Sequence, residues 1–331
     1  MDSRPDPLRP YDGLDPDTVI SAVESLGLAC DGRLLALNSF ENRVYRLGIE
    51  DGSPLVAKFY RPARWPDAAI LEEHAFTLEL GETGLSVVPP LTIAGATLHR
   101  HAGFRFALFA LQGGRAPELG QREALRHLGQ CLGRLHAVGA RSRFANRPTL
   151  DLAGEGDSAV DFLLDNGWLP AELEENFAAL GDALLDAAEA RWALAGPVAR
   201  IRLHGDCHPG NLLWRDDTAH FVDLDDCRNG PAIQDLWMLL SGPPTEQAQQ
   251  LDWLLEGYRI FREFHPAERL LIEPLRTLRL LHYQAWIARR WADPAFPAAF
   301  PWFGEPRHWE GVIAQMQEQL SALQEAASLQ A

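Results

Sequence analysis

Cysteine is scarce in this sequence. The four cysteines, Cys30, Cys131, Cys207 and Cys227, lie far apart, and no two of them form a C-x-x-C pair. Their spacing therefore gives no sign of a structural zinc site or of a disulfide framework. We expect reduced thiols in a reducing compartment.

Long apolar stretches are also missing. No apolar run reaches the roughly 18 residues that a membrane span needs, so we expect no membrane partner. The segment from Met1 to Asp17 is polar and rich in proline and aspartate. It lacks the basic-then-apolar pattern of a signal peptide, which predicts a cytoplasmic protein.

Positive charge is in deficit. Lysine and arginine number 30 against 46 aspartate and glutamate residues, which gives a formal net charge of −16. An acidic surface repels phosphate backbones, so we expect no nucleic-acid partner. The same charge can attract a basic substrate or simply keep the chain in solution.

The order of apolar patterns predicts two lobes. The 331 residues suffice for two cores. Short alternating strands and one helix (67–81) fill the chain as far as residue 111, with two late strands expected at 91–99 and 104–111. Helices dominate after the linker-like stretch 112–115 and include 235–241, 266–290 and 309–329. The prediction is an α+β fold, with a small β-rich nucleotide-binding lobe over residues 1–112 and a larger helical catalytic and substrate lobe over residues 113–331.

The most informative segment runs from Leu203 to Trp214. Within it, Asp206 and Asn211 lie five residues apart in a loop with apolar flanks, and Asp223 follows twelve residues after Asn211. Pro209 and Gly210 predict a tight turn between the first two. We expect an apolar hairpin that presents two carboxylates and one amide at the same end.

These residue types match the needs of phosphoryl transfer. Charge on the transferred group makes catalysis mainly a matter of positioning and electrostatics. Mg²⁺ prefers carboxylate, amide and phosphate oxygens, so Asn211 and Asp223 are the predicted metal ligands. A separate carboxylate must orient the acceptor hydroxyl and take its proton, and Asp206 is the candidate catalytic base.

The same segment resembles a known superfamily. It is similar to the catalytic loop of protein kinases, and more so to the H-G-D-x-H-x-x-N and I-D-x-x-D pattern of the aminoglycoside phosphotransferase and choline kinase group. The resemblance implies a protein-kinase-like fold with ATP and Mg²⁺ as cofactors. It also makes Lys58 the lysine that holds the α- and β-phosphates, with Glu73 as its partner and Glu72 as an open alternative.

Further nucleotide contacts follow from the order of the elements. The turn formed by Ser39, Phe40, Glu41 and Asn42 precedes Lys58, where protein kinases carry a glycine-rich loop. Backbone N–H groups of such a turn can hold phosphates. Adenine is expected against the backbone from Phe109 to Leu111.

The sequence departs from eukaryotic protein kinases. No G-x-G-x-x-G loop precedes Lys58, Gly205 replaces the arginine of H-R-D, and no A-P-E motif follows Asp223. Control through a phosphorylated activation loop therefore lacks its charge partner. These departures predict a site that is formed constitutively.

Nearly all of residues 12–325 resembles the bacterial stress response kinase A family. The matching stretches are 37–45, 58–62, 70–74, 204–211 and 286–297. The resemblance implies a monomeric Ser/Thr protein kinase that acts in bacterial stress survival. Composition and spacing do not establish a protein acceptor, so two alternatives stay open. One is a small-molecule hydroxyl kinase of the aminoglycoside, choline, homoserine or sugar type, and the other is a non-catalytic nucleotide-binding regulator.

Two further features have two interpretations each. Seven aromatic residues crowd the stretch from Trp286 to Trp309. They predict either core packing or a substrate wall, such as a cation–π cage for a choline-like amine. Cys207 and Cys227, beside the predicted site, are either buried small side chains or a redox switch.

Overall fold

The computed structural model describes residues 9–328, which form two compact units. Unit 1 consists of Met1–Pro148, Ile201–Asn229 and Met238–Glu263, and unit 2 consists of Thr149–Arg200, Gly230–Trp237 and Phe264–Ala331. Unit 1 thus draws on residues from both sides of position 113. The division into lobes at that position stays a prediction.

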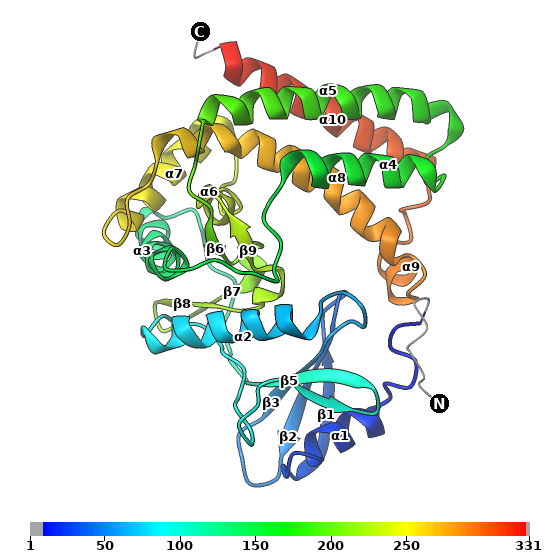
Figure 1. The fold of residues 1–331 in the computed structure, drawn as a ribbon, viewed down its shortest axis with the longest axis vertical. Coiled ribbons are helices and arrows are strands. Elements are labelled where there is room, and N and C mark those ends of the chain that lie inside the picture. The colour runs from blue at the N-terminus through cyan, green and yellow to red at the C-terminus, as the bar shows by residue number, and fades with distance from the viewer. Residues whose placement is uncertain (1–8, 329–331) are drawn as a thin grey trace. The chain divides into compact units, whose positions relative to one another are not determined.

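A five-stranded antiparallel sheet forms the N-terminal part of unit 1, in the order β1-β2-β3-β5-β4 (Figure 1). The strands are β1 (Cys30–Leu37), β2 (Arg43–Ile49), β3 (Leu55–Phe59), β4 (His99–His101) and β5 (Phe104–Ala110). Lys58 pairs with Val44 of β2 and Ala107 of β5, so it lies on the central strand. Helix α2 (Asp67–Glu82) follows β3, as predicted.

Two expectations for this region need correction. The predicted strand over 91–99 is wrong, because only His99–His101 pairs as a strand there. The Leu91 N–H still donates to Leu108 O at 2.7 Å, but Ile93 then pairs with Ala96 across a tight turn in which Ala94 takes a left-handed φ of 50°, and this turn interrupts the strand. A helix that the sequence analysis missed, α1 (Pro16–Glu24), begins where the side chain of Asp15 accepts a 2.8 Å hydrogen bond from the Thr18 N–H.

The rest of unit 1 supports the predicted catalytic loop. Helices α3 (Arg122–Gly139) and α7 (Pro244–Tyr258) pack together, and β6 (Ile201–Leu203) pairs with β9 (Arg228–Gly230). Between β6 and β9 lie the 3₁₀ turn η1 (Pro209–Asn211), the hairpin strands β7 (Leu212–Arg215) and β8 (Thr218–Phe221), and the 3₁₀ turn η2 (Leu224–Asp226). The chain between α2 and β4 runs beside this hairpin, since the Phe221 N–H donates to Ser86 O at 2.9 Å.

Unit 2 is helical. It contains α4 (Leu152–Asp165), α5 (Ala171–Ala195), α6 (Ile233–Trp237), η3 (Pro266–Leu271), α8 (Ile272–Arg290), α9 (Ala295–Ala299) and α10 (Pro306–Ser328). Helices α4, α5, α8 and α10 pack against one another (Figure 1). The helix predicted over 235–241 ends at Trp237, and the predicted end of the last helix, Leu329, lies outside the described residues. Over residues 9–328, every helix is too short or too polar to cross a membrane.

The C-terminal aromatic cluster is mostly core. Phe296, Phe303 and Trp309 are fully buried, and Trp286 packs edge-to-face on Phe296 with ring centroids 5.0 Å apart. The core-packing interpretation therefore holds for most of the cluster. Trp302 is the exception, because 37% of its surface is exposed.

Candidate active site

The hairpin β7–β8 brings Asn211 and Asp223 to the same end. In its register Leu212 pairs with Phe221, so Asn211 precedes one strand and Asp223 follows the other. The N–H of Val222 donates to Asn211 O at 3.1 Å, which extends the pairing to the open end. Antiparallel pairing thus closes the twelve-residue gap between the two predicted metal ligands.

His204 joins the catalytic loop to the Asp223 strand. Its Nε2 donates to Val222 O at 3.0 Å, and its Nδ1 accepts from the Asp206 N–H at 3.4 Å. The next residue, Gly205, has a φ of +88°, and a Cβ there would lie 2.1 Å from Asp226 O. Any side chain at this position would collide with backbone, which explains why glycine replaces the arginine of H-R-D.

Asp206, the candidate base, is oriented by its neighbours. Its Oδ2 lies 3.5 Å from His208 Nε2. The Gly210 N–H donates to His208 Nδ1 at 3.0 Å, which leaves the proton of the neutral ring on Nε2, facing the carboxylate. Asn211 Nδ2 donates to Asp206 O at 2.9 Å. The Asp206 side chain remains 27% exposed, so an acceptor hydroxyl can reach it.

The two predicted metal ligands offer oxygen atoms only. Because Asn211 Nδ2 is bonded to Asp206, its Oδ1 is the atom left for a cation. The Asp223 side chain is 49% exposed, and its backbone takes a left-handed φ of 58°. Among residues 9–328 no cluster of three His, Cys, Asp or Glu side chains is placed to hold a metal. An amide and a single carboxylate fit Mg²⁺, which takes most of its other ligands from water and phosphate.

Lys58 lies among three carboxylates. Its Nζ is 2.8 Å from Asp223 Oδ1, 3.4 Å from Asp225 Oδ1 and 3.6 Å from Glu73 Oε1. Burial lowers the pKa of Lys58, but these carboxylates outweigh burial and raise its pKa above the ordinary value. Burial also raises the pKa of Glu73, to about 7. Lys58 therefore stays charged and links the sheet to the Asp223 strand.

Glu72, the alternative partner, points elsewhere. Its carboxylate accepts hydrogen bonds from the backbone N–H groups of Ala145 and Asn146, both at 2.8 Å, and of Arg147 at 3.1 Å. These bonds fasten α2 to the loop after α3. Of the two glutamates, Glu73 is the one within ion-pair distance of Lys58.

Asp225 is the centre of an ion network that the sequence analysis missed. It accepts hydrogen bonds from Arg64 and, at 3.0 Å, from Asn42 Nδ2. Arg147 donates to the backbone oxygen of Asp225 and, at 2.8 Å, to Glu73 Oε2. Buried cations thus hold η2, α2 and the turn before β2 in one arrangement. No local sequence pattern marks Arg64 or Arg147, because the carboxylates of Asp226 and Glu73 that they bind lie 162 and 74 residues away in the chain.

The turn expected to hold phosphates is braced by protein groups. Asn42 Oδ1 accepts from the Arg61 N–H at 3.1 Å, and Glu41 Oε1 lies 3.2 Å from Arg61 Nε. Tyr11 donates its hydroxyl proton to Glu41 O at 2.8 Å. The side chains of Glu41 and Asn42 therefore shape the turn. Any contact of Ser39 and Phe40 with nucleotide stays a prediction.

Phe109 and Leu111 lie at the end of β5, where adenine was expected. Phe109 pairs with Val56 of β3, and Leu111 follows the last residue of the strand and is exposed. The backbone of this stretch is therefore within the same unit as Lys58 and the hairpin. Its contact with adenine stays a prediction.

Both cysteines beside the site are inaccessible to solvent. Cys207 and Cys227 are fully buried, and burial raises the pKa of the Cys227 thiol. A redox-sensing cysteine needs exposure and thiolate character. The structure favours the interpretation that these are buried small side chains.

Replacing Asp225 with asparagine should destabilise the fold. Removing one partner of a buried ion network typically costs about 3–5 kcal/mol, because the other charges stay buried and uncompensated. Urea unfolding at pH 7 measures the loss. The matched control is Asp217→Asn, in the exposed turn of the β7–β8 hairpin, which should change stability little. Equal midpoints for the two variants would contradict the role of Asp225.

The stability lost in Asp225→Asn should depend on pH and be smaller in acid. Burial raises the pKa of Asp225, but Arg64, Lys58 and Arg147 outweigh it and bring the pKa below the ordinary value. The ionised Asp225 carboxylate therefore makes its full contribution to the free energy of unfolding above the pKa of about 3.9 that it has in the unfolded chain. This contribution is lost as the pH falls below that value. The difference between wild type and Asp225→Asn should shrink in acid.

Comparison with known proteins agrees with this geometry. Residues 33–272 match the model of the family described as "Phosphotransferase enzyme family", APH. The chain belongs to this family. Stress response kinase A of Escherichia coli O157:H7 is 46% identical over 315 residues, which cover 95% of each chain. A Salmonella typhimurium relative named "Serine/threonine protein kinase RdoA" is 44% identical over 315 residues, again 95% of each chain.

Solved phosphotransferases share the fold. The amicoumacin kinase hAmiN, in complex with AMP-PNP, Ca²⁺ and its antibiotic, matches with a TM-score of 0.67 at 18% identity and covers 90% of this chain and 94% of its own. Spectinomycin phosphotransferase matches with a TM-score of 0.64 at 13% identity, over 92% and 98% of the two chains. Family membership and these likenesses confirm the predicted α+β, protein-kinase-like fold and the resemblance on which it rested.

Proposed function

We propose that this phosphotransferase-family chain is an ATP- and Mg²⁺-dependent Ser/Thr protein kinase that acts in bacterial stress survival. The observation that carries the proposal is the end of the β7–β8 hairpin, where Asn211 and Asp223 lie beside Asp206 and Lys58. The relatives at 44–46% identity support the protein-kinase assignment through their names.

Each residue has a distinct part in the proposed reaction. Asp206, held by His208, orients the acceptor hydroxyl and takes its proton as the phosphoryl group moves. Asn211 Oδ1 and the Asp223 carboxylate hold Mg²⁺, which when bound neutralises charge on the phosphates. Lys58, steadied by Glu73, binds the α- and β-phosphates.

The nucleotide contacts complete the proposal. The turn from Ser39 to Asn42 lies at the phosphates, and the backbone from Phe109 to Leu111 lies against adenine. Asp223 already pairs with Lys58 at 2.8 Å, so these two groups loosen their contact when phosphates and cation enter. The half-exposed Asp223 side chain allows that movement.

The cellular setting is proposed from the same features. The proposed protein is a cytoplasmic monomer without a membrane or nucleic-acid partner, and its net charge of −16 supports the exclusion of nucleic acid. Size-exclusion chromatography with light scattering gives the oligomeric state directly. A mass near 36.8 kDa is expected.

A small-molecule kinase is the second candidate. The amicoumacin and spectinomycin kinases share the fold, and the same three catalytic residues would serve either acceptor. Their identities of 13–18% are far below those of the protein-kinase relatives, which favours the protein acceptor. The intact site argues against a non-catalytic regulator.

Labelled ATP distinguishes these candidates. A basic and an acidic Ser/Thr peptide array and a panel of aminoglycosides, choline, homoserine and sugars receive wild-type protein with MgATP. We expect transfer to Ser or Thr in peptides, lost in Asp206→Asn and kept in the control Asp217→Asn. Transfer confined to a small alcohol would move the assignment to that class, and no transfer by wild type to any acceptor would revive the regulator.

A further inference from the structure

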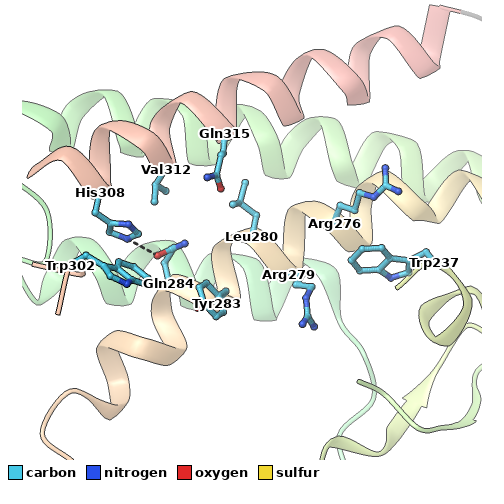
Figure 2. A pocket seen from close by; sticks show the side chains of 10 residues that line it. All are labelled: Trp237, Arg276, Arg279, Leu280, Tyr283, Gln284, Trp302, His308, Val312 and Gln315. Atoms are coloured by element: carbon cyan, nitrogen blue, oxygen red, sulfur yellow. Dashed lines mark hydrogen bonds between the residues drawn. The ribbon is translucent and has the colours of Figure 1, made fainter. Parts of the chain in front are cut away.

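A hollow in unit 2 lies along α8. Its volume is about 600 Å³, within the range of ligand-binding sites. The wall comes from Trp237, from α8 residues between Arg276 and Gln284, and from the chain between Trp302 and Gln315 (Figure 2). None of its lining residues belongs to the catalytic loop or to the β7–β8 hairpin.

The charge of this wall is opposite to that of the chain. Arg276 and Arg279 line the hollow one helical turn apart, and among the described residues that line it none is acidic. The chain as a whole carries a net charge of −16. Arg276 is held in place by a 2.7 Å hydrogen bond to Glu273 and lies 5.7 Å from the Trp237 ring. Glu273 offsets part of this charge, and the wall still presents two guanidinium groups and no carboxylate among its described lining residues, an arrangement that attracts an anion.

The other end of the hollow is aromatic. Tyr283 is 39% exposed, and the exposed Trp302 packs on His308 with ring centroids 4.7 Å apart. His308 Nε2 donates to Gln284 Oε1 at 3.0 Å, which fixes the ring. Tryptophan, tyrosine and arginine are the residues that dominate binding hot spots. Partly exposed rings beside two arginines are the composition of a binding surface.

The two ends are separated by a peptide-sized distance. Arg276 and Gln284 lie eight residues apart on α8, which corresponds to about 12 Å along the axis. An extended chain advances about 3.3 Å per residue, so three to four residues span the hollow. Figure 2 shows Trp237 beside Arg276 at one end and Tyr283, Trp302 and His308 at the other. An open hollow of this length suits an extended segment better than an enclosed small molecule.

We propose that this hollow binds an acidic peptide segment that carries an aromatic residue three or four positions from its acidic side chains. The carboxylates pair with Arg276 and Arg279, and the aromatic ring packs on Tyr283 and Trp302. The source of the segment rests on the proposed function, since we assign it to the protein that the kinase phosphorylates. The two arginines disfavour a choline-like amine at this place.

Fluorescence anisotropy without nucleotide tests the proposal. The probe is a fluorescein-labelled hexapeptide with two adjacent aspartates and a tryptophan three positions later. Wild type should bind it, and binding should weaken at least 10-fold in Arg279→Glu and several-fold in Tyr283→Ala. Arg200→Glu, an equal charge reversal at an exposed position of unit 2, is the matched control and should bind as wild type does. A probe with lysine in place of aspartate should bind weakly to wild type and better to Arg279→Glu.

Several outcomes would overturn the proposal. They are no binding by wild type, equal binding by wild type and Arg279→Glu, or equal binding of the aspartate and lysine probes. Displacement of the peptide by phenyl phosphate at the same concentration would assign the hollow to a small aromatic anion instead. No phosphate is transferred in this binding assay, so its result does not depend on whether the chain is a protein kinase. The panel of acceptors with labelled ATP tests the protein-kinase proposal separately.

Discussion

Asp206→Asn should transfer phosphate about 10²- to 10⁴-fold more slowly than wild type, the usual cost of losing a general base. MgATP affinity should stay within a few-fold, because in the proposed reaction Asp206 acts on the acceptor and not on the nucleotide. The asparagine keeps the size of the side chain and can still contact His208, so the loss reports the missing base. Isothermal titration and a steady-state assay on one preparation measure both quantities.

Two controls sharpen this test. Asp217→Asn carries the same change at the far end of the hairpin and should keep wild-type turnover. His208→Gln removes the ring that orients Asp206 and should lower turnover less than Asp206→Asn does. Near-normal turnover in Asp206→Asn would rule out Asp206 as the base.

Asp223→Asn should abolish transfer and weaken the Mg²⁺-dependent part of ATP binding. A neutral amide is a poorer ligand for a hard divalent cation than a carboxylate, and only Asn211 would remain to assist it. Asparagine tolerates the left-handed backbone of Asp223, so the fold should be preserved. ATP titrations with and without Mg²⁺ measure the change. Full activity together with unchanged MgATP affinity would remove Asp223 from the site.

The hairpin was predictable because its signals are local. Pro209 and Gly210 mark the turn between Asp206 and Asn211, apolar residues lie in both arms of the hairpin that follows, and an antiparallel pair must bring Asn211 and Asp223 to one end. The strand of Lys58 was likewise marked locally, by an apolar stretch directly after the turn at 51–54. In these places spacing and backbone geometry already bring the proposed site residues together.

The ion network around Asp225 was not predictable, because it joins segments far apart in the chain. Arg64 and Arg147 carry no motif, and only the folded structure shows that they neutralise Asp225 and Glu73. Adjacent positions on α2 also left Glu72 and Glu73 undecided. One fastens the loop after α3 and the other faces Lys58, a distinction that helix periodicity alone cannot make.

The strand predicted over 91–99 failed for a related reason. Apolar alternation was present, but pairing also requires backbone donors and an uninterrupted extended chain. The turn at Ala94 interrupts the extended chain, and Ile93 pairs with Ala96 across it instead of with β5. Hydrophobic pattern therefore located the sheet but misplaced the start of β4.

Manganese bound with a non-hydrolysable ATP analogue gives the most direct test that Asn211 and Asp223 share one cation while Asp206 stays free for the acceptor. A crystal structure of that complex should place the anomalous manganese peak about 2.0–2.3 Å from Asn211 Oδ1 and from the Asp223 carboxylate. Asp206 should make no bond to the metal. A peak on Asp206, or a nucleotide bound away from Lys58 and the hairpin end, would contradict the assignment.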